Sequence, residues 1–511
     1  MGEFLVTEAR NGPSTSRFWQ DGAAPVSIRA ICEAIFQIEQ DLALHSRSVA
    51  DVYYWPLLRL AACGRFAHNL GLYDGAPSDS SLGSKLWLKF FSAASSMSGY
   101  AKPAARNFDA IYVSDALRDR RPGYALPIHA ECLSADPQIG QMLVFYRPTQ
   151  RQPRFDDKRY AAYPSTLPQD LGRLAGLFRH RDFEAAMHAE HRLIDSQFRR
   201  VLGLNFPFSP AEMSRIAATF AGQRRAMAHW LSRVHAPRLY INAAYLFQYV
   251  VAAAKDVGME VCELQHGLIT PYHLGYAYPG RPYIPYAPDK LLLLGPYWRD
   301  AAELPANTKP VVIGCRYLDR YLQARAAKIR RQAVIVSQGA IGHRLFEATM
   351  TFARAAPEWR FIFRLHPQEH VNSYTAALSR RGSDLDNLRI SHGSEDFSEL
   401  LARSEVQIGT FSTGLFEGMA YGTRTILLSL PGIEYMSDTI ARGDAVLAHR
   451  AEDVAALLET APASSDPKIY YSAPVPSVTA AIEASDQRPG EAPRDEITAQ
   501  SDGRGPTFLY G

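Results

Sequence analysis

The residues best suited to bind an anion follow a short apolar run in the second half of the chain. The run RFIFRLHPQE predicts a strand over 360–365, which ends at His366 because the next residue, a proline, cannot donate to a sheet. Arg364 and His366 then lie near the sheet edge, where a histidine can donate a hydrogen bond to a phosphate. Glu369 can accept hydrogen bonds from ribose hydroxyls. A histidine satisfied by a backbone carbonyl is an equally good explanation.

Two further strand ends in this region carry small polar residues. The run VQIGTFSTGLFEG predicts a strand, then Ser412 and Thr413 at the start of a helix that carries Glu417. Hydroxyls there are ordinary helix caps, but a helix start also attracts anions through its free N–H groups and its dipole. The run AVIVSQGAIG places Gln338 and Gly339 after a strand. The glycine allows close approach of a ligand, although a tight turn explains it equally well.

A fourth polar strand end lies earlier in the chain. The run EVCELQHG predicts a buried strand followed by Gln265, His266 and Gly267. Burial of polar side chains at this position costs free energy unless they form hydrogen bonds with the protein or with a ligand. The loop that follows is rich in tyrosine and includes Tyr272 and His273, a composition that suits a sugar ring. The alternative is a loop that packs its tyrosines between two domains.

These strand ends need a parallel sheet to bring them together. Between 286 and 460, short β-branched runs alternate with helical patterns, which is typical of a parallel sheet with helices on both faces. A strand over 238–242, a helix over 244–256 and a strand over 260–264 form a β-α-β unit in the first half. We therefore predict an α/β protein with two Rossmann-like domains that face a central cleft, where parallel sheets bind ligands.

The predicted organisation has five parts. They are a disordered tail over 1–25, an N-terminal Rossmann-like domain over 26–285, a C-terminal Rossmann-like domain over 286–460, a linker or crossing segment over 461–483, and a disordered tail over 484–511.

Composition excludes several classes of protein. The chain has 511 residues, 55 Lys and Arg against 52 Asp and Glu, and five scattered cysteines. So small a net charge does not support a dedicated nucleic-acid binder, and the cysteines form no CxxC pair that would indicate a zinc ribbon. No secretory signal or membrane-spanning run is expected, so we predict a cytoplasmic protein. Basic clusters offer a peripheral contact with the inner membrane as an alternative.

The runs ELQHG, DKLLLLGPYW, SQG, RLHPQE and GTFSTGLFEGMAYGTRTILL together resemble bacterial GT-B glycosyltransferases of envelope polysaccharide assembly. The resemblance covers roughly 238–440 and is strongest to the capsule and lipopolysaccharide enzymes that transfer Kdo- or sialic-acid-type sugars from CMP-activated donors. It implies a nucleotide sugar and a glycan or lipid-linked glycan as partners. It also implies that neither a bound metal nor another cofactor is needed, since a helix dipole and side-chain donors stabilise the leaving phosphate.

The resemblance also implies roles for single residues. In the C-terminal nucleotide-sugar domain over 286–460, His366 contacts the donor phosphate, which Ser412 and Thr413 hold at their helix start. The strand-end argument adds Arg364, Gln338 and Gly339 to this donor site. Glu369 and Glu417 are candidates for the ribose or the base. On the other side of the cleft, in the acceptor-side domain over 26–285, Gln265, His266 and Gly267 face the transferred sugar. To these substrate-facing residues we add Asn242 from its strand end and Tyr272 and His273 from the polar loop.

One departure leaves the catalytic group open. Retaining members of this group are expected to place a carboxylate nucleophile in the acceptor domain, but the strand end that would supply it carries Asn242, which can be neither base nor nucleophile. The alternatives are Asp115, Glu263 and His266, the last as a base. The stereochemistry of transfer therefore stays open.

Three other functions fit the same motifs. They are polyol-phosphate transfer from a CDP-alcohol, as in teichoic-acid polymerases, a non-hydrolysing nucleotide-sugar epimerase, and a non-catalytic subunit of a polysaccharide assembly complex. Asn242 is the best support for the last of these.

Overall fold

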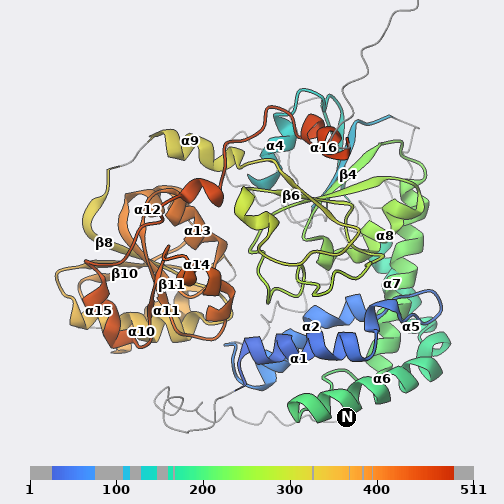
Figure 1. Ribbon diagram of the computed structural model, residues 1–511, viewed down its shortest axis with the longest axis horizontal. Helices are drawn as coiled ribbons and strands as arrows, with labels where there is room; N and C mark the ends of the chain where they lie inside the picture. The colour runs from blue at the N-terminus through green and yellow to red at the C-terminus, as the bar shows by residue number, and fades with distance from the viewer. Residues whose placement is uncertain are drawn as a thin grey trace, which may run out of the picture.

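The protein folds into two α/β units, each built on a parallel sheet, that lie side by side (Figure 1). The computed structural model describes residues 26–74, 107–114, 128–146, 159–164, 167–324, 327–367, 369–381, 385–393 and 395–487. The predicted fold class of two Rossmann-like domains is confirmed. Within these ranges, no helix combines the length and apolar character that crossing a membrane requires.

The sheet of the first unit has the strand order β3-β2-β1-β4-β5-β6-β7 among the described residues, and every pair is parallel. Its strands are β1 Ala110–Ser114, β2 Met142–Tyr146, β3 Tyr160–Pro164, β4 Arg238–Asn242, β5 Glu260–Leu264, β6 Lys290–Leu293 and β7 Lys309–Val312. Strands β4, β5 and β6 are covered on both faces, which explains why they read as continuous apolar runs.

The sheet of the second unit has the order β10-β9-β8-β11-β12-β13, again all parallel. Its strands are β8 Ile329–Val336, β9 Arg360–Arg364, β10 Leu388–Ser391, β11 Ser404–Gly409, β12 Arg424–Leu428 and β13 Val446–Ala448. The helices between them are α10 Gly342–Ala355, α11 Val371–Arg381, α12 Phe397–Arg403, α13 Thr413–Ala420, α14 Ser437–Ala441 and α15 Val454–Leu457.

The helices of the first unit begin with a helical hairpin. The hairpin is α1 Ile28–Asp41 and α2 Trp55–Asn69, followed by α4 Glu131–Ser134, α5 Leu167–Phe178, α6 Arg181–Leu202, α7 Pro210–Leu231, α8 Gln248–Asp256 and α9 Arg316–Ala324. Helix α7 begins as its sequence predicts: Ser209 and Glu212 form a reciprocal cap around Pro210.

The predicted boundary at 285 is wrong in one respect. Strands β6 and β7 belong to the first sheet, where β6 pairs with β5 and β7 pairs with β6. Their apolar runs carry no mark of which sheet they will join, and the rhythm of strand and helix continues through them without interruption. The first sheet therefore extends to Val312.

The end of the described chain returns to the first unit, as the predicted crossing segment allows. Helix α16, Val478–Asp486, lies against the first unit in Figure 1 and buries Val478 and Ile482 beside Leu292 and Val311. The predicted disordered tail from 484 is therefore corrected, because its first residues complete this helix. Residues 1–25 and 488–511, the rest of the predicted tails, lie outside the described residues.

One hydrophobic cluster joins the two units. It packs Leu268 and Trp298 of the first unit against Leu415 and Phe416 of the second. The indole N–H of Trp298 donates to the carbonyl of Tyr470 at 2.8 Å, so the returning chain is fixed to the same cluster. The apolar cluster therefore spans the boundary between the two units.

The returning helix should stabilise the first unit. Ile482 is 0% exposed, so Ile482→Ala should lower the free energy of unfolding by about 2–5 kcal/mol through the cavity it leaves. Urea titration of this variant and of Ala484→Ser, an exposed position on the same helix, measures the effect. Equal stability of the two variants would contradict the packing described.

Candidate functional site

Three of the polar strand ends predicted from sequence are neighbours in the second sheet. Strands β9, β8 and β11 lie next to one another and run parallel. Their carboxyl ends therefore reach one edge, where the loops after them carry His366, Gln338 with Gly339, and Ser412. The structure thus brings together the donor-side candidates that the sequence placed on three separate strands.

Arg364 is the cation of this edge. Its Nη1 donates to the hydroxyl of Ser391 at 3.0 Å, and its guanidinium lies 5.7 Å from the centre of the Phe397 ring. Burial lowers the pKa of Arg364, although it remains a cation at neutral pH. The nearby carboxylates of Glu395 and Asp396 act against this shift, although neither lies within ion-pair distance of the guanidinium among the pairs of described residues. Its remaining N–H donors suit an anionic ligand.

Glu369 fixes the turn after β9. Its carboxylate accepts hydrogen bonds from the hydroxyls of Ser337, at 3.0 Å, and Tyr374, and from the backbone N–H of His366 at 2.6 Å. These contacts tie the end of β9 to the end of β8. Glu369 therefore positions half-buried His366, and any ribose hydroxyl would compete with three donors for its oxygens.

The start of α13 has the expected cap. The Ser412 hydroxyl accepts a hydrogen bond from the N–H of Gly414 at 3.2 Å, so the ordinary cap is present. Thr413 is half-buried at the positive end of the helix. One turn later, Glu417 accepts a hydrogen bond from the Tyr317 hydroxyl at 3.1 Å. Burial raises the pKa of Glu417 to about 7, so this carboxyl is partly protonated at neutral pH.

A hydrogen-bonded chain of three side chains lies at the end of β5 in the first unit. The Tyr276 hydroxyl donates to Glu263 at 2.8 Å and lies 3.4 Å from Nδ1 of His266. On the other side of the imidazole, Nε2 lies 3.2 Å from the hydroxyl of Tyr245. Because the proton of Tyr276 goes to Glu263, Nδ1 of His266 carries the ring proton, and Nε2 is the acceptor.

Burial shifts the pKa values of Glu263 and His266 in opposite directions. It raises the pKa of Glu263 to about 7, against the hydrogen bond from Tyr276, and lowers the pKa of His266 to about 4. The imidazole is therefore neutral at pH 7 and can accept a proton. Glu263 is only 2% exposed, whereas the side chain of His266 is 24% exposed, so His266 is the member that a substrate can reach.

His273 and Asn242 are two further residues of the first unit that the sequence analysis predicted to face the substrate. His273 packs beside the hydrogen-bonded side chains: its ring centre lies 5.3 Å from that of Tyr245 and 5.0 Å from that of Tyr276. Asn242 is half-buried at the end of β4, with its Oδ1 3.5 Å from the hydroxyl of Tyr112.

The prediction that Gln265 faces a sugar is corrected. The residue is 1% exposed, and its amide donates to the carbonyl of Gly267 at 3.1 Å and accepts from the N–H of Leu294 at 3.0 Å. Tyr272 is not brought to His266 either: its carbonyl accepts from Cys32, and its ring lies 5.7 Å from the guanidinium of Arg29. Asp115 lies outside the described residues.

The two candidate groups meet at Gly267. A methyl group on this glycine would lie 4.0 Å from Oγ1 of Thr413, so the loop after β5 lies close to the start of α13. Leu268 and Leu415, next to these two positions in sequence, belong to one buried cluster. The carboxyl edges of the two sheets therefore lie near each other and form one candidate site.

Three aromatic residues of this site escaped the sequence analysis. His129 precedes α4, its Nδ1 is buried without a partner, and its ring meets that of Tyr317 edge-on at 5.7 Å. Burial and the neighbouring His266 lower the pKa of His129 to about 3. No motif marks His129 or Tyr317, but Tyr245 follows β4 and could have been found by the strand-end rule.

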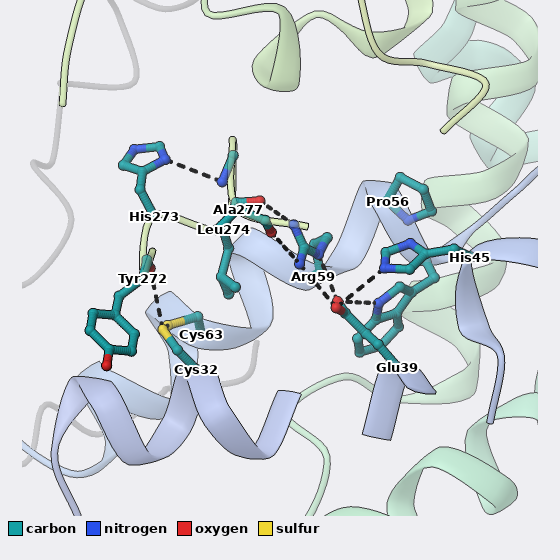
Figure 2. Close-up of polar contacts among 12 residues, drawn as sticks. Cys32, Glu39, His45, Pro56, Arg59, Cys63, Tyr272, His273, Leu274 and Ala277 are labelled. Carbon is teal, nitrogen blue, oxygen red and sulfur yellow. Dashed lines mark hydrogen bonds and ion pairs between the residues drawn. The ribbon is translucent and has the colours of Figure 1, made fainter. Parts of the chain in front are cut away.

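Helices α1 and α2 support the loop of this site from behind. Figure 2 shows buried Arg59 between Glu39 and the loop. Arg59 pairs with Glu39 at 2.7 Å and donates to the carbonyls of Leu274 and of Ala277, the second at 3.0 Å. These two carbonyls flank Tyr276, so the ion pair fixes the backbone that carries its hydroxyl.

Comparisons with known proteins give structural neighbours alone. No model of a protein family matches the chain, and no curated protein matches it. Among solved structures, it is similar to the α,α-trehalose 6-phosphate synthase of Burkholderia multivorans, at 12% identity over 71% of this chain and 92% of that one, with a TM-score of 0.41. It is also similar to HepE of Anabaena in complex with UDP and glucose, at 12% identity over 69% and 89%, with a TM-score of 0.39. A third is the UDP-GlcNAc 2-epimerase of Methanocaldococcus jannaschii, at 11% identity over 50% and 78%, with a TM-score of 0.34.

The raised pKa of Glu263 predicts that the free energy of unfolding falls as the pH rises. Because its folded pKa of about 7 exceeds its ordinary 4.5, the stability linked to its protonated form is complete below pH 4.5 and is lost as the pH rises through 7. Glu263→Gln removes this loss. From pH 5 to 8, the free energy of unfolding of the variant should therefore gain about 2–3 kcal/mol relative to the native protein.

Urea titrations at several pH values measure this difference. Glu358→Gln, at an exposed position, is the matched control and should follow the native profile. Parallel profiles for the native protein and Glu263→Gln would show that Glu263 ionises normally in the folded state.

Proposed function

We propose that this protein transfers a sugar from a nucleotide-activated donor to a glycan acceptor. The observation that carries the proposal is the proximity of Gly267 to Thr413, where an added methyl group would lie 4.0 Å from Oγ1, because it brings the loop that carries His266 close to the sheet edge that carries Arg364. The donor is a CMP-linked sugar of the Kdo or nonulosonic-acid type, and the acceptor is a cell-surface glycan or its lipid-linked precursor. The reaction takes place in the cytoplasm or at the inner surface of the membrane.

The second unit holds the donor. Arg364, His366 and the start of α13 surround the position for the phosphate, and Glu417 offers a partly protonated carboxyl to the nucleoside. A CMP-sugar carries a single phosphodiester charge, which one guanidinium and one helix start can balance. As the bond to the sugar breaks, charge grows on this phosphate, and donors fixed beforehand stabilise it without reorganisation.

The first unit supplies the base. An acceptor hydroxyl gives its proton to Nε2 of His266, while its oxygen bonds to the anomeric carbon of the donor and the nucleotide monophosphate leaves with the electrons of the broken bond. Tyr276 and Glu263 hold the imidazole in the tautomer whose Nε2 carries no proton, and the acceptor hydroxyl takes the place of the Tyr245 hydroxyl that lies 3.2 Å from Nε2. This assigns a base to His266 and an orienting role to Glu263, a role that its burial permits.

Nucleotide binding tests the donor side. Arg364→Ala should weaken the binding of CMP about tenfold or more, because a charge-assisted hydrogen bond to phosphate is lost. Calorimetric titration with CMP measures the affinity. Arg360→Ala is the matched control, since Arg360 lies exposed at the opposite end of the same strand, and should bind CMP as the native protein does. Equal affinity of both variants would place CMP elsewhere.

Turnover tests the reaction. His366→Ala should lower the release of CMP from a CMP-sugar by about 10²–10³, and His266→Ala should lower it while leaving CMP affinity unchanged. Chromatography of the nucleotide products measures both. Near-normal turnover in His366→Ala would contradict the assignment. Interconversion of epimers without release of CMP would favour the epimerase, and transfer from a CDP-alcohol would favour the polyol-phosphate reaction.

A further inference from the structure

Two helix starts border the centre of the second sheet. Strands β8 and β11 are neighbours, but the chain continues from β8 to β9 on one side and from β11 to β12 on the other. The strand order therefore reverses between β8 and β11, and open parallel sheets bind ligands in the crevice at such a point. Helices α10 and α13 follow these two strands and pack on opposite faces of the sheet, in separate hydrophobic clusters.

The start of a helix attracts an anion, because its first N–H groups have no partner within the helix and its dipole is positive there. A ligand with two phosphates in the crevice can use both helix starts, whereas a ligand with one phosphate needs only one. The groups of the protein that already occupy these starts therefore decide how many phosphates the crevice accepts.

The start of α10 is occupied by a carboxylate from the first unit. Oδ2 of Asp74 accepts a hydrogen bond from the backbone N–H of Arg344 at 3.2 Å, and Oδ1 lies 3.0 Å from Nε of the same arginine. The side chain of Asp74 is 14% exposed and that of Arg344 is 20% exposed. A carboxylate that contacts both a helix N–H and a guanidinium takes the contacts that a phosphate would make there.

Backbone contacts hold Asp74 at this position. The guanidinium of Arg344 also donates to the carbonyls of Gly71 and of Leu72, the second at 3.2 Å. The N–H of Asp74 donates to the carbonyl of Ala340, in the loop between β8 and α10, at 2.5 Å. These bonds join the chain after α2 to the loop after β8, so the carboxylate is fixed by its own backbone as well as by its ion pair.

A second carboxylate closes the same helix start from within the second unit. A Cβ added to Gly342, the first residue of α10, would overlap Oε1 of Glu369. Two negative charges, those of Asp74 and Glu369, therefore lie beside the start of α10. A phosphate placed there would be repelled by both, and it would find the N–H of Arg344 already bonded.

The start of α13 differs, because its cap is the neutral hydroxyl of Ser412. From this difference we propose that Asp74 is a specificity-determining residue, which restricts the crevice to nucleotides that carry a single phosphate. The phosphate lies at α13, and Asp74 takes the place of a second phosphate at α10. The inference rests on the proposed function, since it concerns the donor of that reaction, and it excludes donors linked through a diphosphate.

Calorimetric titration of the full chain with CMP and with CDP tests this inference, because the two nucleotides differ by one phosphate. The native protein should bind CMP at least tenfold more tightly than CDP. Asp74→Ala should raise the affinity for CDP at least tenfold, because the N–H and the guanidinium of Arg344 become available to the second phosphate. Asp41→Ala removes an exposed ion pair of the first unit, with Arg200, and is the matched control that should keep the native preference.

Two further variants separate an opened phosphate position from a loosened contact between the units. Arg344→Gln in the Asp74→Ala background should abolish the gain in CDP affinity, because the second phosphate loses its cation. Asp74→Asn keeps the size of the side chain and removes its charge, so it should give a smaller gain of the same sign.

The outcomes distinguish this inference from the proposed function. Binding of CMP with no gain for CDP in Asp74→Ala or Asp74→Asn, or a gain that persists without Arg344, would overturn the role of Asp74 and leave the donor site in place. Tighter binding of CDP than of CMP by the native protein would overturn both that role and a single-phosphate donor. Binding of neither nucleotide would contradict the proposed function and this inference with it.

Discussion

The arrangement of the first unit depends on a buried ion pair between Glu39 and Arg59. Arg59 is 1% exposed and Glu39 is 4% exposed, so each charge must be compensated inside the protein. Glu39 satisfies part of the guanidinium, and the donors that remain reach the carbonyls of Leu274 and Ala277. A helix hairpin distant in sequence therefore fixes the loop that carries Tyr276. Removal of one partner from such a pair typically costs about 3–5 kcal/mol, because the other charge stays buried.

Burial then sets the chemistry of the loop. One apolar environment raises the pKa of Glu263 and lowers that of His266, because it disfavours the charged form of each. The result is an imidazole that is neutral at physiological pH and fixed by hydrogen bonds on both sides. The second unit provides the opposite environment, where Arg364 keeps its charge and the start of α13 adds a positive dipole. A site with a neutral imidazole on one side and a guanidinium on the other suits transfer of a sugar away from an anionic leaving group.

The carboxyl edge of the second sheet could be predicted from the sequence, because an apolar run that ends in polar residues marks both a strand and the residues at its carboxyl end. His366 and Ser412 were found this way. The same rule failed at Gln265, where the polar side chain is used by the fold itself to bridge β5 and the end of β6. The same rule could not assign β6 and β7 to a sheet, because a buried strand has the same apolar pattern in either sheet. Arg59 and His129 escaped because their partners lie far away in sequence.

The central claim is that a nucleotide binds between the two sheet edges. A crystal structure of the protein with CMP tests this most directly. We predict that the phosphate lies within hydrogen-bond distance of Arg364 or His366, at the start of α13, with His266 across the cleft. Nucleotide bound elsewhere, with the space between Gly267 and Arg364 empty or filled by protein side chains, would contradict the account.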